Sequence, residues 1–236
     1  MHWFMISSSM AQGIAQFVKI APPAMRRFFF EDNFSFTTVQ SLLSLAYTHP
    51  FILFLFIAYP ALFFHREICS AQEKGILALT LSKPISRASY LVNLIISSLL
   101  NIIALGFAAA AGVILSYYIY NTAGGALTNF MLAIINLVLL ALFLGGLALL
   151  IAVCATNSGQ ATGWMIGLPL ALYLLEFLGK SMKQIAFLSP FNPFHYFNPQ
   201  KVLYEGKISY EDAGFLMGGA IVLSGLSFFS FRRKDV

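Results

Sequence analysis

Few residues in this chain have the types and spacing that chemistry requires. His65 and His195 stand alone, without a second ligand at the spacing that a metal site needs. Cys69 and Cys154 lie far apart at the ends of apolar runs, which predicts two free thiols. The chain contains no Gly-x-Ser-x-Gly elbow, no His-Glu-x-x-His pair and no glycine-rich phosphate loop. We therefore expect no catalytic residue, no metal and no cofactor bound by this chain.

One polar-edged segment, Glu73–Tyr90 with the sequence EKGILALTLSKPISRASY, stands between two long hydrophobic runs. Its helical periodicity places residues at i, i+1, i+4 and i+5 on one face, namely Ile76, Leu77, Thr80 and Leu81. Pro84 disfavours helix at the residue before it, and Ser86 can cap the helix that follows. The segment predicts an in-plane helix, an elbow and a membrane helix. Such a segment is suited to transmit movement of a soluble partner to the spans on either side. It is equally suited to be a plain interfacial helix in a tight connection.

The elements around this segment are predicted to be membrane helices. The chain has 236 residues, of which 59% are hydrophobic and 10% charged, and no Asp, Glu, Lys or Arg occurs from Ala88 to Leu175. A bilayer-crossing helix needs about 20 predominantly apolar residues. The predicted fold class is therefore an all-α, polytopic helical membrane protein with about five spans, near residues 41–64, 91–120, 130–154, 164–177 and 215–231.

Three further pieces complete one predicted membrane domain over residues 1–236. Residues 1–37 predict an outer interfacial helix broken by paired prolines, residues 65–90 a cytoplasmic loop, and residues 178–214 an outer loop. Five spans place seven Lys and Arg on each side, but those near residues 65–90 and the C-terminus are more concentrated, which favours the cytoplasm there. The net charge of +5 favours contact with anionic lipid, and nothing predicts nucleic-acid binding.

The stretch QEKGILALTLSKPISR resembles the segment that follows the second membrane helix in permease subunits of ABC transporters of the ABC-2 type. The matching residues are Glu73, Gly75, Leu77, Leu79, Leu81, Ser82, Pro84, Ile85, Ser86 and Arg87. Ile76, Ala78 and Thr80 depart from the residues usual in the family. The likeness extends more weakly to the paired prolines, the spacing of the later spans and the C-terminal FRRKDV.

The resemblance implies the membrane subunit of an ATP-driven exporter in a bacterial inner membrane, with a cytoplasmic C-terminus. In that family two six-helix permeases form a dimer, homomeric or heteromeric, and bind a separate cytoplasmic ATPase that uses ATP and Mg. The coupling region would be residues 67–82 with the adjoining elbow, and the implied coupling residues are Glu67, Glu73, Gly75, Leu77, Leu81, Pro84 and Arg87. Replacing Leu77 and Leu81 with Asp is predicted to uncouple ATP hydrolysis from transport and to leave membrane insertion intact.

The five predicted spans are one fewer than the family has in each half. The family has a membrane helix before the paired prolines, where this chain has only about 37 residues. A segment upstream, a five-span form and a helix supplied by another chain all explain the difference. We favour the upstream segment.

Three other features have two interpretations each. Gly163 and Gly167 form a small-xxx-small pattern, for which packing within the chain is favoured over dimerisation. Glu176, near the end of the fourth span, is costly in hydrocarbon, and solvation at the interface is favoured over a transport pathway or a polar contact. The aromatic run from Phe187 to Pro199 favours an interfacial belt over a gate.

Two rival functions follow from the same observations. A non-transporting membrane scaffold or assembly protein would tether a soluble partner through residues 65–90, and its binding would ignore nucleotide. A secondary carrier needs ionisable residues within its spans, and their near absence argues against proton or sodium coupling.

Overall fold

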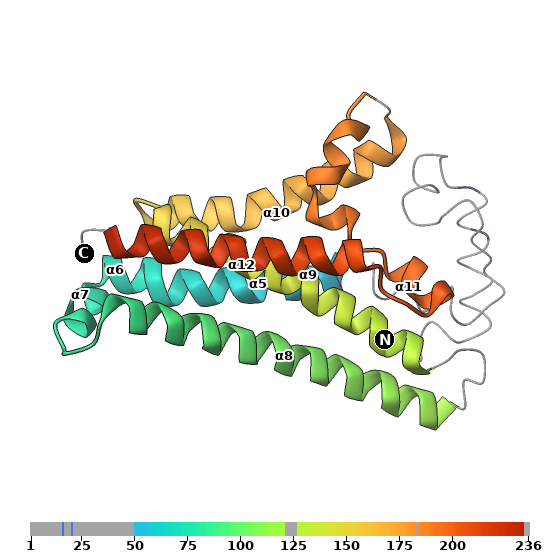
Figure 1. Ribbon diagram of the computed structural model, residues 1–236, viewed down its shortest axis with the longest axis horizontal. Coiled ribbons are helices and arrows are strands. Elements are labelled where there is room, and N and C mark those ends of the chain that lie inside the picture. The colour runs from blue at the N-terminus through green and yellow to red at the C-terminus, as the bar shows by residue number, and fades with distance from the viewer. Residues whose placement is uncertain (1–15, 17–19, 21–49, 121–126, 183, 234–236) are drawn as a thin grey trace.

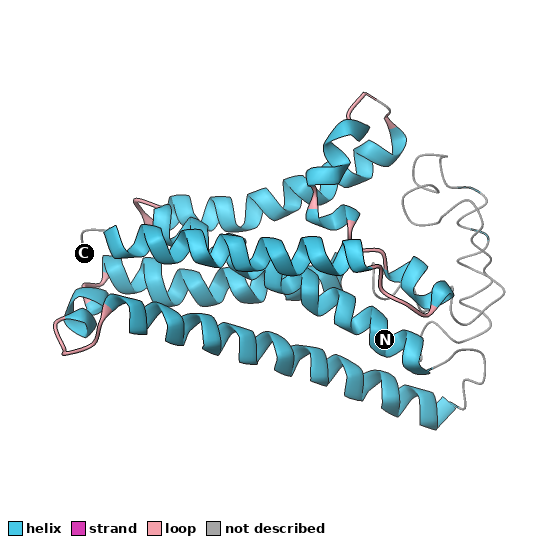
Figure 2. Ribbon diagram, viewed as in Figure 1, coloured by secondary structure: helices cyan, strands magenta, loops and turns pink. Residues whose placement is uncertain are grey.

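All regular structure in the described residues is helical (Figure 2). The computed structural model describes residues 50–120, 127–182 and 184–233, together with Gln16 and Ile20, so nearly all of the predicted segment 1–37 and the predicted start of the first span lie outside the described residues. In chain order the elements are α5 (Pro50–Phe64), η1 (His65–Ser70), α6 (Ala71–Glu73), α7 (Ile76–Leu81), α8 (Arg87–Tyr120), α9 (Leu127–Cys154), α10 (Ser158–Ser181), η2 (Ala186–Phe191), η3 (Pro193–His195), α11 (Pro199–Glu205) and α12 (Tyr210–Arg233).

Five helices in these residues are long and apolar enough to cross a membrane, which confirms the predicted fold class. Their candidate spans are Ile52–Glu73, Arg87–Leu115, Leu127–Cys154, Ser158–Gly179 and Tyr210–Arg233. The first span ends later than predicted, because the helix continues from α5 through the π-helical segment η1 and through α6 to Glu73. The charged residues after Phe64 do not break it, since Arg and Glu are good helix formers. The predicted loop 65–90 therefore contracts to the residues between Glu73 and Arg87.

Helix α9 is the most buried span of the bundle, and α12 packs closely against it. In the most apolar 18-residue stretch of α9, 61% is buried inside the bundle, against 39% or less in the corresponding stretches of the other four spans. A Cβ added at Gly146 of α9 would lie 3.1 Å from the carbonyl oxygen of Ala220, and one added at Gly219 of α12 would overlap the ring of Phe143. Glycine at these positions lets the two helices approach more closely than any larger residue would.

Gly163 and Gly167 of α10 do not share this packing role. A Cβ built at either position meets no described atom within 4 Å. No described residue supports the preference for packing within the chain, which stays a prediction. Both positions are exposed among the described residues, and contact with a second subunit stays a prediction.

Basic residues are concentrated at one end of the bundle. Figure 1 shows α6, α7, the end of α12 and the turn from α9 to α10 together at one end, with α11 and the end of α8 at the other. This is the grouping that the five predicted spans require. We call the first end the basic end; its described Arg and Lys residues are Arg66, Lys74, Lys83, Arg87, Arg232 and Arg233.

Candidate functional site at the basic end

The amphipathic segment folds as a short helix between two turns. Gly75 has φ +70°, a left-handed conformation that favours glycine, and α7 begins at the next residue. After α7 the chain turns through Pro84, and Ser86 Oγ accepts a hydrogen bond from the Ser89 amide at 3.0 Å. The predicted order of helix, elbow and capped membrane helix is confirmed, although the helix begins only after the glycine.

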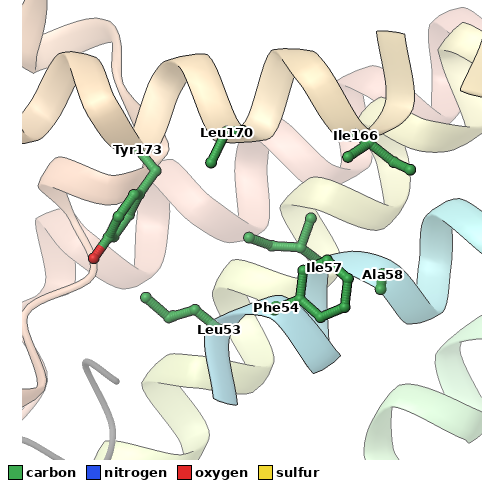
Figure 3. Close-up of a pocket in the computed structure, with 7 residues that line it drawn as sticks. All are labelled: Leu53, Phe54, Ile57, Ala58, Ile166, Leu170 and Tyr173. Carbon is green, nitrogen blue, oxygen red and sulfur yellow. The ribbon is translucent and has the colours of Figure 1, made fainter. Parts of the chain in front are cut away.

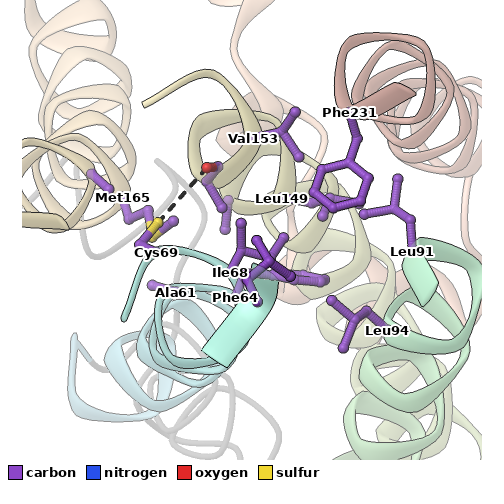
Figure 4. Packing of buried hydrophobic residues seen from close by; sticks show 14 residues of the cluster. Ala61, Phe64, Ile68, Cys69, Leu91, Leu94, Leu149, Val153, Met165 and Phe231 are labelled. Carbon is purple, nitrogen blue, oxygen red and sulfur yellow. Dashed lines mark hydrogen bonds between the residues drawn. The ribbon is translucent and has the colours of Figure 1, made fainter. Parts of the chain in front are cut away.

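Leu77 anchors α7 to the bundle. Its side chain has no exposed surface and lies in a buried cluster with Phe64, Leu91 and Phe231, against which Leu81 also packs; Figure 4 shows this cluster. An Asp in place of Leu77 would put a carboxylate among apolar side chains, which is strongly unfavourable. The double Asp variant is therefore expected to disrupt the fold, so it is not the clean test of coupling that the sequence suggested.

The outward surface of α7 is apolar and flanked by basic residues. Ile76 is 50% exposed and Leu79 is 69% exposed, while the exposed Lys74 and Lys83 stand on either side of the helix. The predicted face is therefore wrong in one member, because Ile76 points outward and Leu77 sets the rotation of the helix. A patch of this kind at a bundle end can bind a soluble partner through apolar contact and through basic residues at its rim.

Glu73 is bound within the chain. Its Oε1 accepts a hydrogen bond of 2.8 Å from the backbone amide of Ser158, the first residue of α10. The Nε2 atom of His65 lies 2.7 Å from Ser158 Oγ. The sequence prediction missed Ser158, although Asn157 followed three residues later by Gln160 is typical of a helix N-terminus. The structure brings Glu73 to α10 rather than leaving it free for a partner.

The remaining predicted residues lie around the same end. Glu67 forms an exposed ion pair with Arg66, 3.5 Å from Nε to Oε1, and its carbonyl oxygen accepts a 2.8 Å hydrogen bond from the Tyr90 hydroxyl. Arg87 begins α8, directly after the elbow at Pro84. The structure therefore brings the predicted coupling residues to one end of the bundle, where their roles differ. Leu77 anchors α7, Gly75 forms the turn before it, and Glu73 joins the first span to α10.

A comparison with protein families now identifies the class. Residues 5–236 match the family model described as ABC-2 family transporter protein. The chain belongs to this family. It is thus a permease component of an ABC transporter and an integral membrane protein, and as such a component it is not itself catalytic. Neither a curated protein nor a solved structure matches the chain.

An apolar groove opens between two spans of this ABC-2 permease. It has a volume of about 410 Å³ and lies between α5 and α10. Figure 3 shows side chains of the two helices facing each other across it. The lining residues are Leu53, Phe54, Ile57, Ala58, Ile166, Leu170 and Tyr173. The groove is chemically suited to an acyl chain or another apolar molecule.

Glu176 of the permease is buried rather than solvated. Its side chain is 6% exposed, and its Oε1 lies 3.3 Å from Nδ1 of His195. Its Oε2 has no hydrogen-bond partner in the described part of the chain. The preference for solvation is therefore wrong, because η3 folds back and places His195 against α10. Glu176 instead makes the polar contact that the sequence left as its alternative.

Proposed function

We propose that this chain is the membrane-spanning subunit of an ATP-driven exporter, and that α7 is the docking element for a separate cytoplasmic ATPase. The observation that carries the proposal is the orientation of α7, which Leu77 holds against the bundle while Ile76 and Leu79 face outward. The ATPase would bind ATP and Mg, and this chain would bind neither. Export is the direction that the family resemblance implies.

The charge distribution supports a cytoplasmic basic end. The two sides of the predicted spans have seven Arg and Lys each, but those at the basic end are concentrated in two short segments next to the membrane. Short segments rich in Lys and Arg remain on the cytoplasmic side of a membrane. This orientation puts α7 and the end of α12 in the cytoplasm of a bacterial cell, with the chain in the inner membrane.

The open side of α10 supports a second permease subunit. Gly163 and Gly167 lie one turn apart with no described atom near them, and Trp164 between them is 57% exposed. Small residues at this spacing let another membrane helix approach closely. We assign this surface to a permease dimer, homomeric or heteromeric, in which the apolar groove beside α10 would be shared or covered.

Affinity purification of the tagged chain from its native membrane tests the docking element. Leu79→Asp is expected to abolish recovery of the ATPase and its hydrolytic activity, because it puts a charge at the centre of the outward face. Phe191→Asp is the matched control, since Phe191 is 78% exposed at the opposite end. Recovery of an active ATPase with the Leu79 variant would show that α7 is not the docking element. If the unaltered chain recovers a partner that binds regardless of nucleotide and no ATPase, the scaffold function replaces the transporter.

A further inference from the structure

Two polar contacts join the end of the first span to the start of α10. Glu73 Oε1 accepts the hydrogen bond from the Ser158 amide at 2.8 Å, and His65 Nε2 lies 2.7 Å from the hydroxyl of the same residue. We call this group of three residues the Ser158 latch. It connects elements that are more than 80 residues apart in the sequence.

The latch supplies a hydrogen-bond acceptor to the first backbone amide of α10. The first amides of a helix lack partners within the helix, and a carboxylate near them is favoured by the helix dipole. Asn157 Oδ1 accepts from the Gln160 amide at 2.7 Å, which caps α10 from within its own segment. The Ser158 amide takes its acceptor from another helix instead. The start of α10 therefore depends on the position of Glu73.

The local helix geometry brings both latch residues to the same place. His65 is the first residue of the π-helical segment η1, and Glu73, eight residues later, is the last residue of α6. A π-helical turn contains more residues than an α-helical turn, so it changes the direction in which later side chains point. Both side chains contact Ser158, one from the start of this segment and one from the short helix after it. Such an interruption of an α-helix is frequently found at functional sites.

The junction behind the latch is loosely filled. A pocket of about 250 Å³ lies there, with lining residues from the end of the first span and from the turn between α9 and α10: Cys69, Gln72, Glu73, Ala155, Thr156, Asn157 and Ser158. Close-packed side chains would resist separation of the two elements. A pocket whose two walls are joined by the hydrogen bond between Glu73 and Ser158 resists it less. The start of α10 can therefore move when the latch contacts break.

We propose that the Ser158 latch is the joint through which movement of α7 reaches α10, closed in one packing of the transporter and open in the other. The inference rests on the proposed docking of an ATPase at α7. Glu73 lies two residues before the Gly75 hinge, so a displacement of α7 acts on it directly. Because α10 also lines the apolar groove, opening of the latch changes the width of that groove.

Cys69 offers a built-in reporter of the latch. It is buried beside the pocket, whereas Cys154 is exposed and is replaced by serine for the measurement. The rate at which a small maleimide modifies Cys69 in the purified full-length chain then reports how often the junction opens. Ser158→Pro removes the amide that Glu73 binds, and proline is well tolerated at the first position of a helix. Glu73→Ala removes the acceptor, and Glu73→Gln keeps an acceptor oxygen as the matched control.

We expect Cys69 to react about tenfold faster in the Ser158→Pro and Glu73→Ala variants, a factor equivalent to about 1.4 kcal/mol. Ser158→Ala, which removes only the contact with His65, gives a smaller increase. Glu73→Gln stays within about twofold of the unaltered chain because its amide oxygen still accepts the hydrogen bond, although a neutral acceptor forms a weaker one. Equal rates in all five chains would overturn the latch.

The complex with the co-purified ATPase supplies the second readout. A non-hydrolysable ATP analogue with Mg is expected to change the Cys69 rate in the unaltered complex and to have no effect in Glu73→Ala, which retains ATP hydrolysis but loses transport. An ATPase that binds and hydrolyses while the Cys69 rate ignores nucleotide overturns the latch alone. Failure of the native chain to recover any ATPase overturns the docking proposal and the latch together.

Discussion

Gly219→Ala is expected to loosen the contact between α9 and α12. The added Cβ would overlap the ring of Phe143, and that ring stacks on Phe215 with centroids 5.9 Å apart and planes 12° apart. The ring therefore cannot turn aside without losing its neighbour. Overpacking a well-filled contact costs about 1–3 kcal/mol. Alanine also gains about 0.8–1.0 kcal/mol over glycine in a helix interior, so the net effect needs a control that shares this gain.

Gly218→Ala is that control, because a Cβ at Gly218 meets no described atom within 4 Å. The helix-propensity gain is common to both variants and cancels in their difference. Unfolding midpoints of the two purified chains in the same detergent should differ by roughly 2–12 °C, at about 2–4 °C per kcal/mol for a chain of this length. A Gly219 variant as stable as the Gly218 variant would refute the close approach of α9 and α12.

Three further substitutions test other parts of the structure. Leu77→Ala should cost about 2–5 kcal/mol by opening a cavity, whereas Leu79→Ala should stay within about 0.5 kcal/mol; equal losses in thermal unfolding would contradict the placement of α7. Gly206→Ala should cost about 1–2 kcal/mol, because φ is +66° where α11 ends, and faster proteolysis after α11 would report it. His195→Ala should cost about 1–3 kcal/mol of unfolding free energy, because it removes the polar partner of the buried Glu176 side chain. A double-mutant cycle with Glu176→Gln should show coupling between the two residues.

The spans were predictable because the bilayer imposes one strong requirement on composition and length. A charge-free run from Ala88 to Leu175, divided by short polar turns, leaves little choice except several membrane helices. The helix ends were less predictable. Polar and charged residues such as Arg66 and Glu67 fit at the interface without ending a helix, so α5 continues through η1 into α6 until Gly75 stops it.

The candidate site was predictable in location but not in detail. The elbow was recognisable in the sequence from its proline, its serine and the helical periodicity before it. Its residues lie at one end of the bundle as expected. The direction in which each side chain points depends on tertiary contacts that no local pattern contains. Leu77 and Ile76 are neighbours with similar chemistry, and only the buried cluster at the basic end distinguishes the anchor from the exposed residue.

The contacts of α10 explain why this helix, rather than α12, is the one suited to move. Helix α12 is held against α9 by a close approach at Gly219 and at Gly146 of α9. In the described part of the chain α10 has polar contacts at both ends: Ser158 in the latch at the basic end, and Leu172 and Glu176 toward the other, where they contact Asn192 and His195. If the latch opens while the second set of contacts holds, α10 pivots about its far end. The groove then widens more at Ile166 than at Tyr173, so movement at the basic end controls access to an apolar site deeper in the membrane.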